Sequence, residues 1–125
     1  MKKKILIIDD EELLTKTFSK FLEKKDFEVF IAKKGQDAID MAEEEMFDLI
    51  ISDMRMPGLD GIQTAMKLRE VFEKKKLKMP PEIFITGYSD ENKEMQARAL
   101  CPVAYIMKPF DVNDLLGAIN EALKK

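Results

Sequence analysis

The residues of this chain that could do chemistry stand at or just after the ends of short apolar runs: Asp9, Asp10, Asp53, Thr86 and Lys108. A carboxylate at the end of a buried run is costly unless a cation or hydrogen-bond donors meet it. The chain has no histidine, so any reaction that needs an imidazole must take it from another molecule.

The apolar runs themselves have the length and composition of strands. Each has four to six residues and is rich in Ile, Val or Phe, which is typical of strands buried on both faces of a parallel sheet. The runs are Ile5–Ile8, Phe27–Ala32, Leu49–Ser52, Ile83–Thr86 and Val103–Ile106.

Stretches with helical spacing separate these runs, and each has apolar residues on one face. The expected faces are Leu14, Phe18, Phe21 and Leu22; Ala38, Ile39 and Ala42; Ile62, Ala65, Met66 and Phe72; Met95, Ala99 and Leu100; and Leu115, Leu116, Ile119 and Leu123. Five successive strand–helix units predict a doubly wound α/β sandwich. Ligands of such sheets bind beyond the carboxyl ends of the strands, where the acids, the threonine and the lysine stand.

Length, charge and composition limit the number of domains and the classes of partner. A chain of 125 residues predicts a single domain over 1–125, and a net charge of −3 from 24 acids and 21 bases argues against binding nucleic acid or membranes by bulk charge. No apolar run approaches the roughly 20 residues that span a bilayer. The single cysteine, Cys101, rules out an internal disulfide and favours a cytoplasmic location.

The acids predict a metal site. If the first and third strands are neighbours, Asp9 and Asp10 come within about 5 Å of Asp53, where each charge pair repels by about 3 kcal/mol. Three ionised acids and Lys108 sum to a local charge of −2. Carboxylate oxygens without histidine or cysteine favour Mg²⁺ or Mn²⁺. Because Mg²⁺ commonly binds only one or two carboxylates, it would leave a coordination position open for a phosphoryl oxygen.

Each of these residues also has an ordinary structural explanation. Asp10, followed by Glu11 and Glu12, could cap a helix, and Asp53 could be a turn residue at a strand end. Thr86 could be a loop hydroxyl and Lys108 a solvated lysine. The placement of all of them at one edge of the sheet favours a functional site over these separate explanations.

Four motifs in register, "ILIIDDEELL", "DLIISDMRMPGLDGI", "IFITG" and "AYIMKPF", resemble the receiver domains of two-component response regulators, the chemotaxis regulators among them. The resemblance runs from about Lys4 to Leu123. It implies a flavodoxin-like, three-layer sandwich with a five-stranded parallel sheet in the strand order 2-1-3-4-5.

The resemblance also implies the role of each site residue. Asp53 would accept the phosphoryl group, and Asp10, Asp53 and the backbone carbonyl of Arg55 would bind Mg²⁺ directly. Asp9 would act on the metal mainly through water, and Lys108 would pair with the phosphoryl group.

Three further residues complete the implied site. Thr86 would hydrogen-bond the phosphoryl group and, with Tyr105 changing rotamer, would form a switch; the peptide bond before Pro109 would be cis. Arg55 and Tyr88 are two bulky residues beside the site. The preferred explanation is that both are solvated side chains, and the alternative hypothesis is that they shield the acyl phosphate from water.

The function that these roles imply is a phosphorylation-dependent signalling switch, not a metabolic enzyme, that catalyses its own phosphorylation and dephosphorylation. The donor would be a phosphohistidine on a histidine kinase or phosphotransfer protein. The signal would pass to a downstream protein or to an output domain missing from this chain, with no direct nucleic-acid or membrane contact. The domain would be a monomer or a weak homodimer.

Three other functions remain open on the sequence. A Mg²⁺-dependent phosphohydrolase with an aspartyl nucleophile would want a second acid where Arg55 stands. A flavodoxin-like cofactor binder would want a phosphate-binding loop in place of "DDEELL". A receiver-like module that is never phosphorylated would not need the complete set of acids, hydroxyl and lysine.

Overall fold

Five parallel strands form one sheet in the order β2-β1-β3-β4-β5, as expected. The computed structural model describes residues 2–55, 58–87 and 90–124. The strands are β1 (Lys4–Ile8), β2 (Glu28–Ala32), β3 (Leu49–Asp53), β4 (Glu82–Thr86) and β5 (Ala104–Met107). The doubly wound α/β prediction is confirmed.

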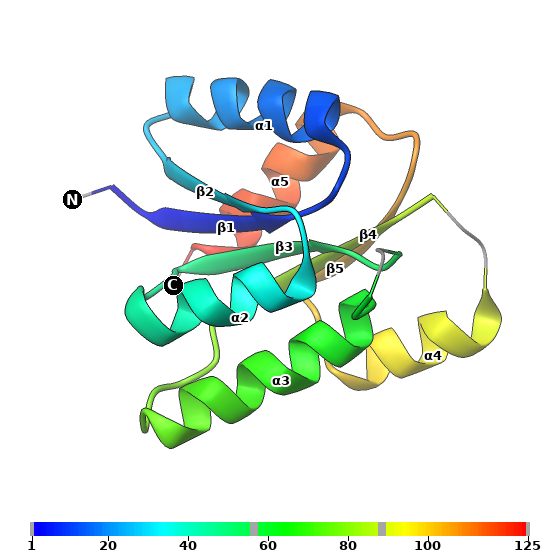
Figure 1. Cartoon of the computed structure of the whole chain (residues 1–125). Coiled ribbons are helices and arrows are strands. Elements are labelled where there is room, and N and C mark those ends of the chain that lie inside the picture. Colours follow the sequence, from blue (N-terminus) through cyan, green and yellow to red (C-terminus); the bar gives the residue numbers. More distant parts are fainter. Residues whose placement is uncertain (1, 56–57, 88–89, 125) are drawn as a thin grey trace.

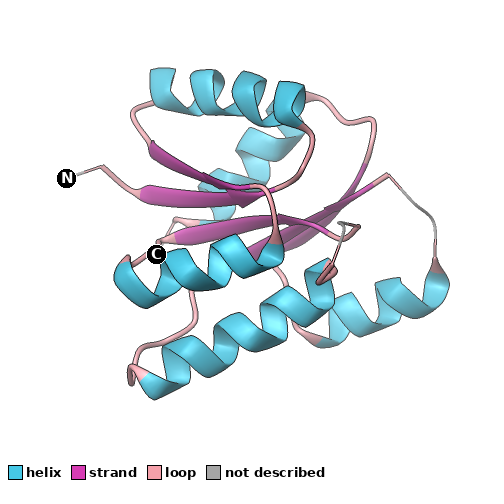
Figure 2. Cartoon of the chain, viewed as in Figure 1, coloured by secondary structure: helices cyan, strands magenta, loops and turns pink. Residues whose placement is uncertain are grey.

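Helices cover both faces of the sheet and complete the three layers (Figure 1). They are α1 (Glu12–Lys24), α2 (Gly35–Glu44), α3 (Gly61–Lys74), α4 (Glu91–Ala99) and α5 (Val112–Ala122). Figure 2 shows α1 and α5 on one side of the strands and α2, α3 and α4 on the other. None of these helices, within the described part of the chain, is long and apolar enough to cross a bilayer.

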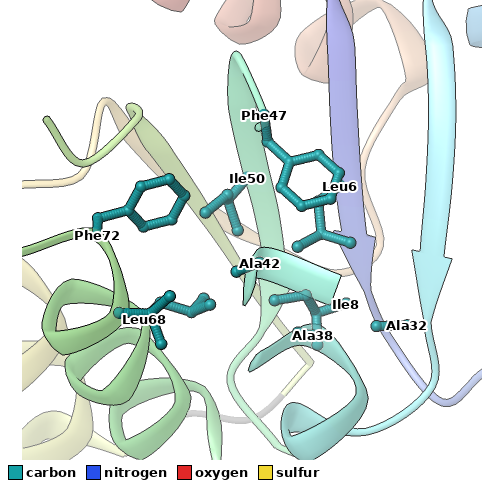
Figure 3. Close-up of a cluster of buried hydrophobic side chains, with 10 residues drawn as sticks. Leu6, Ile8, Ala32, Ala38, Ala42, Phe47, Ile50, Leu68 and Phe72 are labelled. Carbon is teal, nitrogen blue, oxygen red and sulfur yellow. The ribbon is translucent and has the colours of Figure 1, made fainter. Parts of the chain in front are cut away.

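The strands are apolar on both faces because each face has its own helical layer. Ile5 and Ile7 of β1 pack in the cluster that contains Phe18 of α1 and Leu115 of α5. The alternate β1 residues, Leu6 and Ile8, point to the opposite face because successive strand side chains alternate. There they join α2 and α3 in a second cluster (Figure 3), whose labelled members are Leu6, Ile8, Ala32, Ala38, Ala42, Phe47, Ile50, Leu68 and Phe72.

Two strands begin one residue later than predicted. Phe27 precedes β2, because its N–H donates to the carbonyl of Leu22 and so completes the C-terminal end of α1. Val103 precedes β5 and is 37% exposed. The residues before it, Cys101 with φ 57° and the proline Pro102, hold the backbone in a turn until this point.

Two helix faces differ from the prediction. Met66 of α3 and both Met95 and Ala99 of α4 are exposed, whereas Ala97 of α4 is fully buried. Methionine is apolar but adaptable, so its spacing alone is a weak indicator of a core position. Within α4, all of whose residues are described, Ala97 is the one buried side chain, and Leu100 packs against the same cluster.

Polar contacts secure both ends of α4 to α3. Near its N-terminus, Lys93 Nζ lies 2.8 Å from Asp60 Oδ2, at the start of α3. At its C-terminus, the carbonyl of Leu100 accepts a hydrogen bond of 3.1 Å from Arg69, which also pairs with the buried Glu82 at 2.6 Å. Helix α4 is therefore attached chiefly by ion pairs and hydrogen bonds.

A close approach of α3 to β3 requires glycine at position 61. The N–H of Gly61 donates to the carbonyl of Met54 at 3.1 Å. A Cβ atom here would lie 2.7 Å from the carbonyl oxygen of Asp53 and 2.8 Å from Cα of Met54, and backbone atoms cannot move aside cheaply. Glycine thus allows the start of α3 to pack against the strand end that bears Asp53.

We expect Gly61→Ala to lower the free energy of unfolding by about 1–3 kcal/mol, because the added methyl group overpacks against fixed backbone. Urea denaturation monitored by circular dichroism measures this change. Gly117→Ala in α5 is the matched control, because a Cβ there meets nothing within 4 Å. Removing a helical glycine should stabilise the control by about 0.5–1 kcal/mol. Equal stabilities for the two variants would contradict the close approach.

Candidate functional site

The pairing of β1 with β3 brings the three aspartates together. Ile8 lies opposite Ser52 in this pairing, so the residues that follow, Asp9 and Asp53, lie side by side at the sheet edge. One carboxylate oxygen from each of Asp9, Asp10 and Asp53 lies within 4.8 Å of the others. Asp9 and Asp53 are buried and Asp10 is exposed, so the cluster opens to solvent on one side.

A local hydrogen bond positions the Asp9 carboxylate, and the start of α1 leaves Asp10 free of a capping role. The carboxylate of Asp9 accepts a hydrogen bond of 2.9 Å from the N–H of Glu11, which ties the side chain to the turn before α1. The residue that caps α1 is Glu11, and its side chain makes no capping hydrogen bond. The alternative of Asp10 as the helix cap is therefore wrong, and its carboxylate faces the cluster instead.

The loop after β3 presents backbone groups to Asp53. The N–H of Met54 donates to the carbonyl of Ile85 at 2.9 Å and continues the strand pairing beyond Asp53. The N–H of Arg55 then approaches Asp53 Oδ1 at 3.4 Å, while the Arg55 residue as a whole is exposed. Tyr88, named with Arg55 in the shielding hypothesis, lies outside the described residues.

Lys108 supplies the cation of the site. Its backbone N–H donates to the carbonyl of Thr86 at 2.7 Å, which holds the turn after β5 beside the end of β4. Its Nζ lies 3.5 Å from Asp53 Oδ2, 3.6 Å from Asp9 Oδ2 and 2.6 Å from Glu11 Oε1. The bond from Lys108 to Pro109 is cis.

Burial and mutual repulsion perturb the protonation of the cluster. Burial, followed by the charge of Asp9, raises the pKa of Asp53 to about 6, against the opposing effect of Lys108. Burial also raises the pKa of Asp9. Burial alone would lower the pKa of Lys108, but the hydrogen bond with Glu11 and the charges of Asp53 and Asp9 together raise it. One lysine does not neutralise the acids.

This set of groups fits a hard divalent cation. The ligands are carboxylate oxygens, and neither histidine nor cysteine stands among them, which favours Mg²⁺ or Mn²⁺ over softer metals. Burial, and for Asp53 the neighbouring charge of Asp9, makes ionisation of these acids unfavourable, and a bound cation would offset both effects. Asp9, Asp10 and Asp53 could hold such an ion.

Thr86 and Tyr105 lie beside the acids on β4 and β5. Thr86 is 2% exposed at the end of its strand, and Tyr105 is half-buried. Burial raises the pKa of the Tyr105 hydroxyl, and a hydrogen bond with Thr86 partly offsets this effect. The guanidinium carbon of Arg98 lies 5.2 Å from the Tyr105 ring centre, a cation–π contact.

Thr86 and Tyr105 line an open pocket of about 210 Å³, together with residues that follow β3 and residues at the start of α4. It is lined by Met54, Arg55, Asp60, Thr86, Asp90, Lys93 and Tyr105. The structure thus brings the predicted Thr86, Tyr105 and Arg55 together around one space next to Asp53.

Sequence reasoning missed three residues here. Glu11 appeared in the sequence only as an acid that follows a possible helix cap at Asp10, and the Asp60–Lys93 ion pair was not anticipated. The four consecutive acids after the first strand, residues 9–12, were a signal that a glutamate could face the site rather than the helix. The Asp60–Lys93 pair joins residues 33 apart and left no signal in the pattern.

Comparison with known proteins supports the resemblance to receiver domains that the four sequence motifs indicated. The family model for the response regulator receiver domain matches residues 5–120. The transcriptional regulatory protein SrrA of Staphylococcus aureus is 32% identical over 125 residues, which cover 100% of this chain and 49% of that protein. The chain therefore spans about half the length of the curated relatives it matches.

Two solved structures have the same fold. A CheY-like receiver domain protein from Methanospirillum hungatei JF-1 superposes with a TM-score of 0.89 at 29% identity, covering 99% of this chain and 95% of that one. A response regulator from Burkholderia pseudomallei, solved with a phosphorylated aspartic acid, calcium ion and citrate, gives a TM-score of 0.82 at 25% identity over 98% and 70% of the two chains. Because the family match spans nearly the whole chain and the acidic sheet edge agrees with it, the chain belongs to the response regulator receiver domains, the phosphorylation-dependent signalling domains of two-component systems.

Proposed function

We propose that Asp53 accepts a phosphoryl group from a phosphohistidine of a partner protein in a Mg²⁺-dependent reaction, and that the new charge alters a partner-binding face. The observation that carries this proposal is the convergence of three carboxylates within 4.8 Å, with Lys108 Nζ 3.5 Å from Asp53. In the reaction, a bond forms between Asp53 Oδ and phosphorus, the P–N bond of the phosphohistidine breaks, and the imidazole leaves. The chain itself has no histidine to serve as donor.

The chain contributes positioning and charge to this transfer. A carboxylate is a weak nucleophile, but phosphoryl transfer through a loose transition state depends mainly on alignment and charge neutralisation. Asp53 is held at the end of a fully buried strand, and Lys108 stands next to it with a positive charge for the phosphoryl oxygens. Asp9, Asp10, Asp53 and the carbonyl of Arg55 would hold Mg²⁺. When bound, the ion supplies the positive charge that lets carboxylate and phosphoryl oxygens approach each other.

Phosphorylation of Asp53 is directly testable. Incubation with acetyl phosphate and Mg²⁺ should add the mass of one PO₃ group to the wild-type chain, as measured by intact-protein mass spectrometry. Asp53→Ala should gain none, and chelation of the metal should abolish the adduct in wild type. Asp48→Ala, at a half-buried acid before β3, is the control for loss of a carboxylate. An unchanged adduct in Asp53→Ala would refute the assignment.

The raised pKa of Asp53 makes a metal-free pocket unfavourable at neutral pH. In the unfolded chain Asp53 ionises near pH 4, whereas in the folded chain it ionises near pH 6. Between these values the unfolded state binds fewer protons, so rising pH favours unfolding. The penalty is absent below about pH 4, grows between pH 4 and 6 and is complete above that range.

We therefore expect Asp53→Asn, without metal, to raise the free energy of unfolding at pH 7 by up to about 3 kcal/mol. The gain should disappear as the pH falls to 4, because both states of wild type then hold the proton. Denaturation curves between pH 4 and 8 give the measurement. Asp26→Asn removes an equal charge from a side chain that is 84% exposed and should show no such pH dependence. A gain that is constant over this range would contradict the raised pKa.

The switch part of the proposal concerns Thr86 and Tyr105. A phosphoryl group adds a charge of about −1.5 to −2 at neutral pH, next to the hydroxyl of Thr86. Thr86 would turn toward it and give up its hydrogen bond with Tyr105. Tyr105 would then move into the vacated space, and the surface of α4, β5 and α5 would change its affinity for a partner.

We expect Thr86→Ala to bind a phosphoryl mimic but to lose most of the response at α4 and β5. Amide chemical shifts in NMR spectra recorded with and without beryllofluoride and Mg²⁺ report both events. Thr86→Ser keeps the hydroxyl and should respond as wild type does. A full response of α4 and β5 in Thr86→Ala would show that the signal takes another route.

The partners follow from the same chemistry. The donor is a histidine kinase or a phosphotransfer protein, because these classes carry phosphohistidine. The relative SrrA is named a transcriptional regulatory protein and is about twice as long as this chain. The receiver would correspondingly act on an output domain or on a separate downstream protein.

A further inference from the structure

The closest carboxylate to the ammonium group of Lys108 belongs to Glu11, not to Asp53. The Lys108 Nζ donates a hydrogen bond of 2.6 Å to Glu11 Oε1, while Asp53 and Asp9 lie at 3.5 and 3.6 Å. Lys108 is the cation expected to meet the phosphoryl group. In this structure, its short contact is therefore with an acid outside the metal cluster.

The position of Glu11 is consistent with a role toward Lys108 rather than toward its helix. Glu11 caps α1, yet its side chain makes no capping hydrogen bond. Its backbone N–H donates to Asp9 at 2.9 Å, which fixes the residue next to the acids. The adjacent Glu12 instead pairs with Lys33 at 3.4 Å. Of the two neighbouring glutamates, Glu11 therefore contacts the site and Glu12 contacts a surface lysine.

We infer that Glu11 is a positioning residue that competes for the Lys108 ammonium, holding it at 2.6 Å while Asp53 lies at 3.5 Å, until a phosphoryl group replaces Glu11 as the nearer partner. The inference rests on the proposed phosphorylation of Asp53. The phosphoryl group brings a charge of about −1.5 to −2 against the single charge of Glu11. On this inference, Lys108 gives up its short contact with Glu11 as it moves closer to the phosphoryl group, so Glu11 favours the unphosphorylated state and limits spontaneous activation.

Affinity for beryllofluoride with Mg²⁺ tests this competition, and fluorine NMR titration measures it. Glu11→Gln should bind the mimic about three- to tenfold more tightly than wild type, because Lys108 is released in advance. Glu12→Gln removes an equal charge one residue away and should bind within twofold of wild type. Equal affinity of wild type and Glu11→Gln would overturn the inference.

A double-mutant cycle separates the contact from simple charge repulsion. In a Lys108→Met background, Glu11 has no ammonium to hold, so Glu11→Gln should no longer strengthen binding. If the substitution strengthens binding equally in both backgrounds, Glu11 acts by repelling the anion and not through Lys108, and the inference is wrong.

A measurement on the resting protein keeps the two proposals apart. Lysine-selective ¹⁵N NMR, without metal or anion, should show a scalar coupling between Lys108 Nζ and the Glu11 carboxyl group. It should also show a restrained ammonium that becomes more mobile in Glu11→Gln but not in Glu12→Gln. Unchanged mobility in Glu11→Gln would overturn the role of Glu11. Failure of wild type to accept any phosphoryl group or mimic would instead overturn the role of Asp53.

Discussion

Repulsion among carboxylates at one edge of the sheet is the constraint on which the rest of this molecule depends. The chain places Asp9 and Asp53 in buried positions, Asp10 at the opening, and one lysine among them. Burial, followed by the charge of Asp9, raises the pKa of Asp53 as a result of this placement. The core on both faces of the sheet must supply the stability that keeps these groups together.

The surrounding backbone converts that constraint into a defined geometry. Parallel pairing of β1 with β3 fixes the distance between the acids, and the hydrogen bond from Lys108 to the carbonyl of Thr86 brings the cation to the same edge. Gly61 allows α3 to begin directly beside the strand that bears Asp53. These main-chain contacts set the positions from which the acids and Lys108 reach the sheet edge.

Much of this arrangement was predictable from the sequence, for a physical reason. The alternation of apolar runs and helical stretches predicted the sandwich, and the parallel strands required the residues at their ends to converge. The strand order came from the family resemblance. Ion pairs between side chains were harder to predict from the sequence, because the adjacent Glu11 and Glu12 do not reveal which of them contacts Lys108.

The errors have equally local causes. Met66 and Met95 occupy positions that match helical spacing, yet methionine tolerates exposure and both side chains face solvent. The start of β5 was placed one residue early, because Val103 donates its N–H to the carbonyl of Glu82 but lies in a bend before the paired residues begin at Ala104. Spacing alone also could not show that α4 meets the core through so small a residue as Ala97.

The shallow seating of α4 has a consequence for how such domains diversify. A helix that buries one alanine can exchange many of its exposed residues at little cost to folding, except those that make ion pairs or ring contacts, such as Lys93 and Arg98. The acids and the lysine at the sheet edge do not have that freedom. Substitutions on α4 can thus change the exposed surface of the domain while the sheet edge stays as it is.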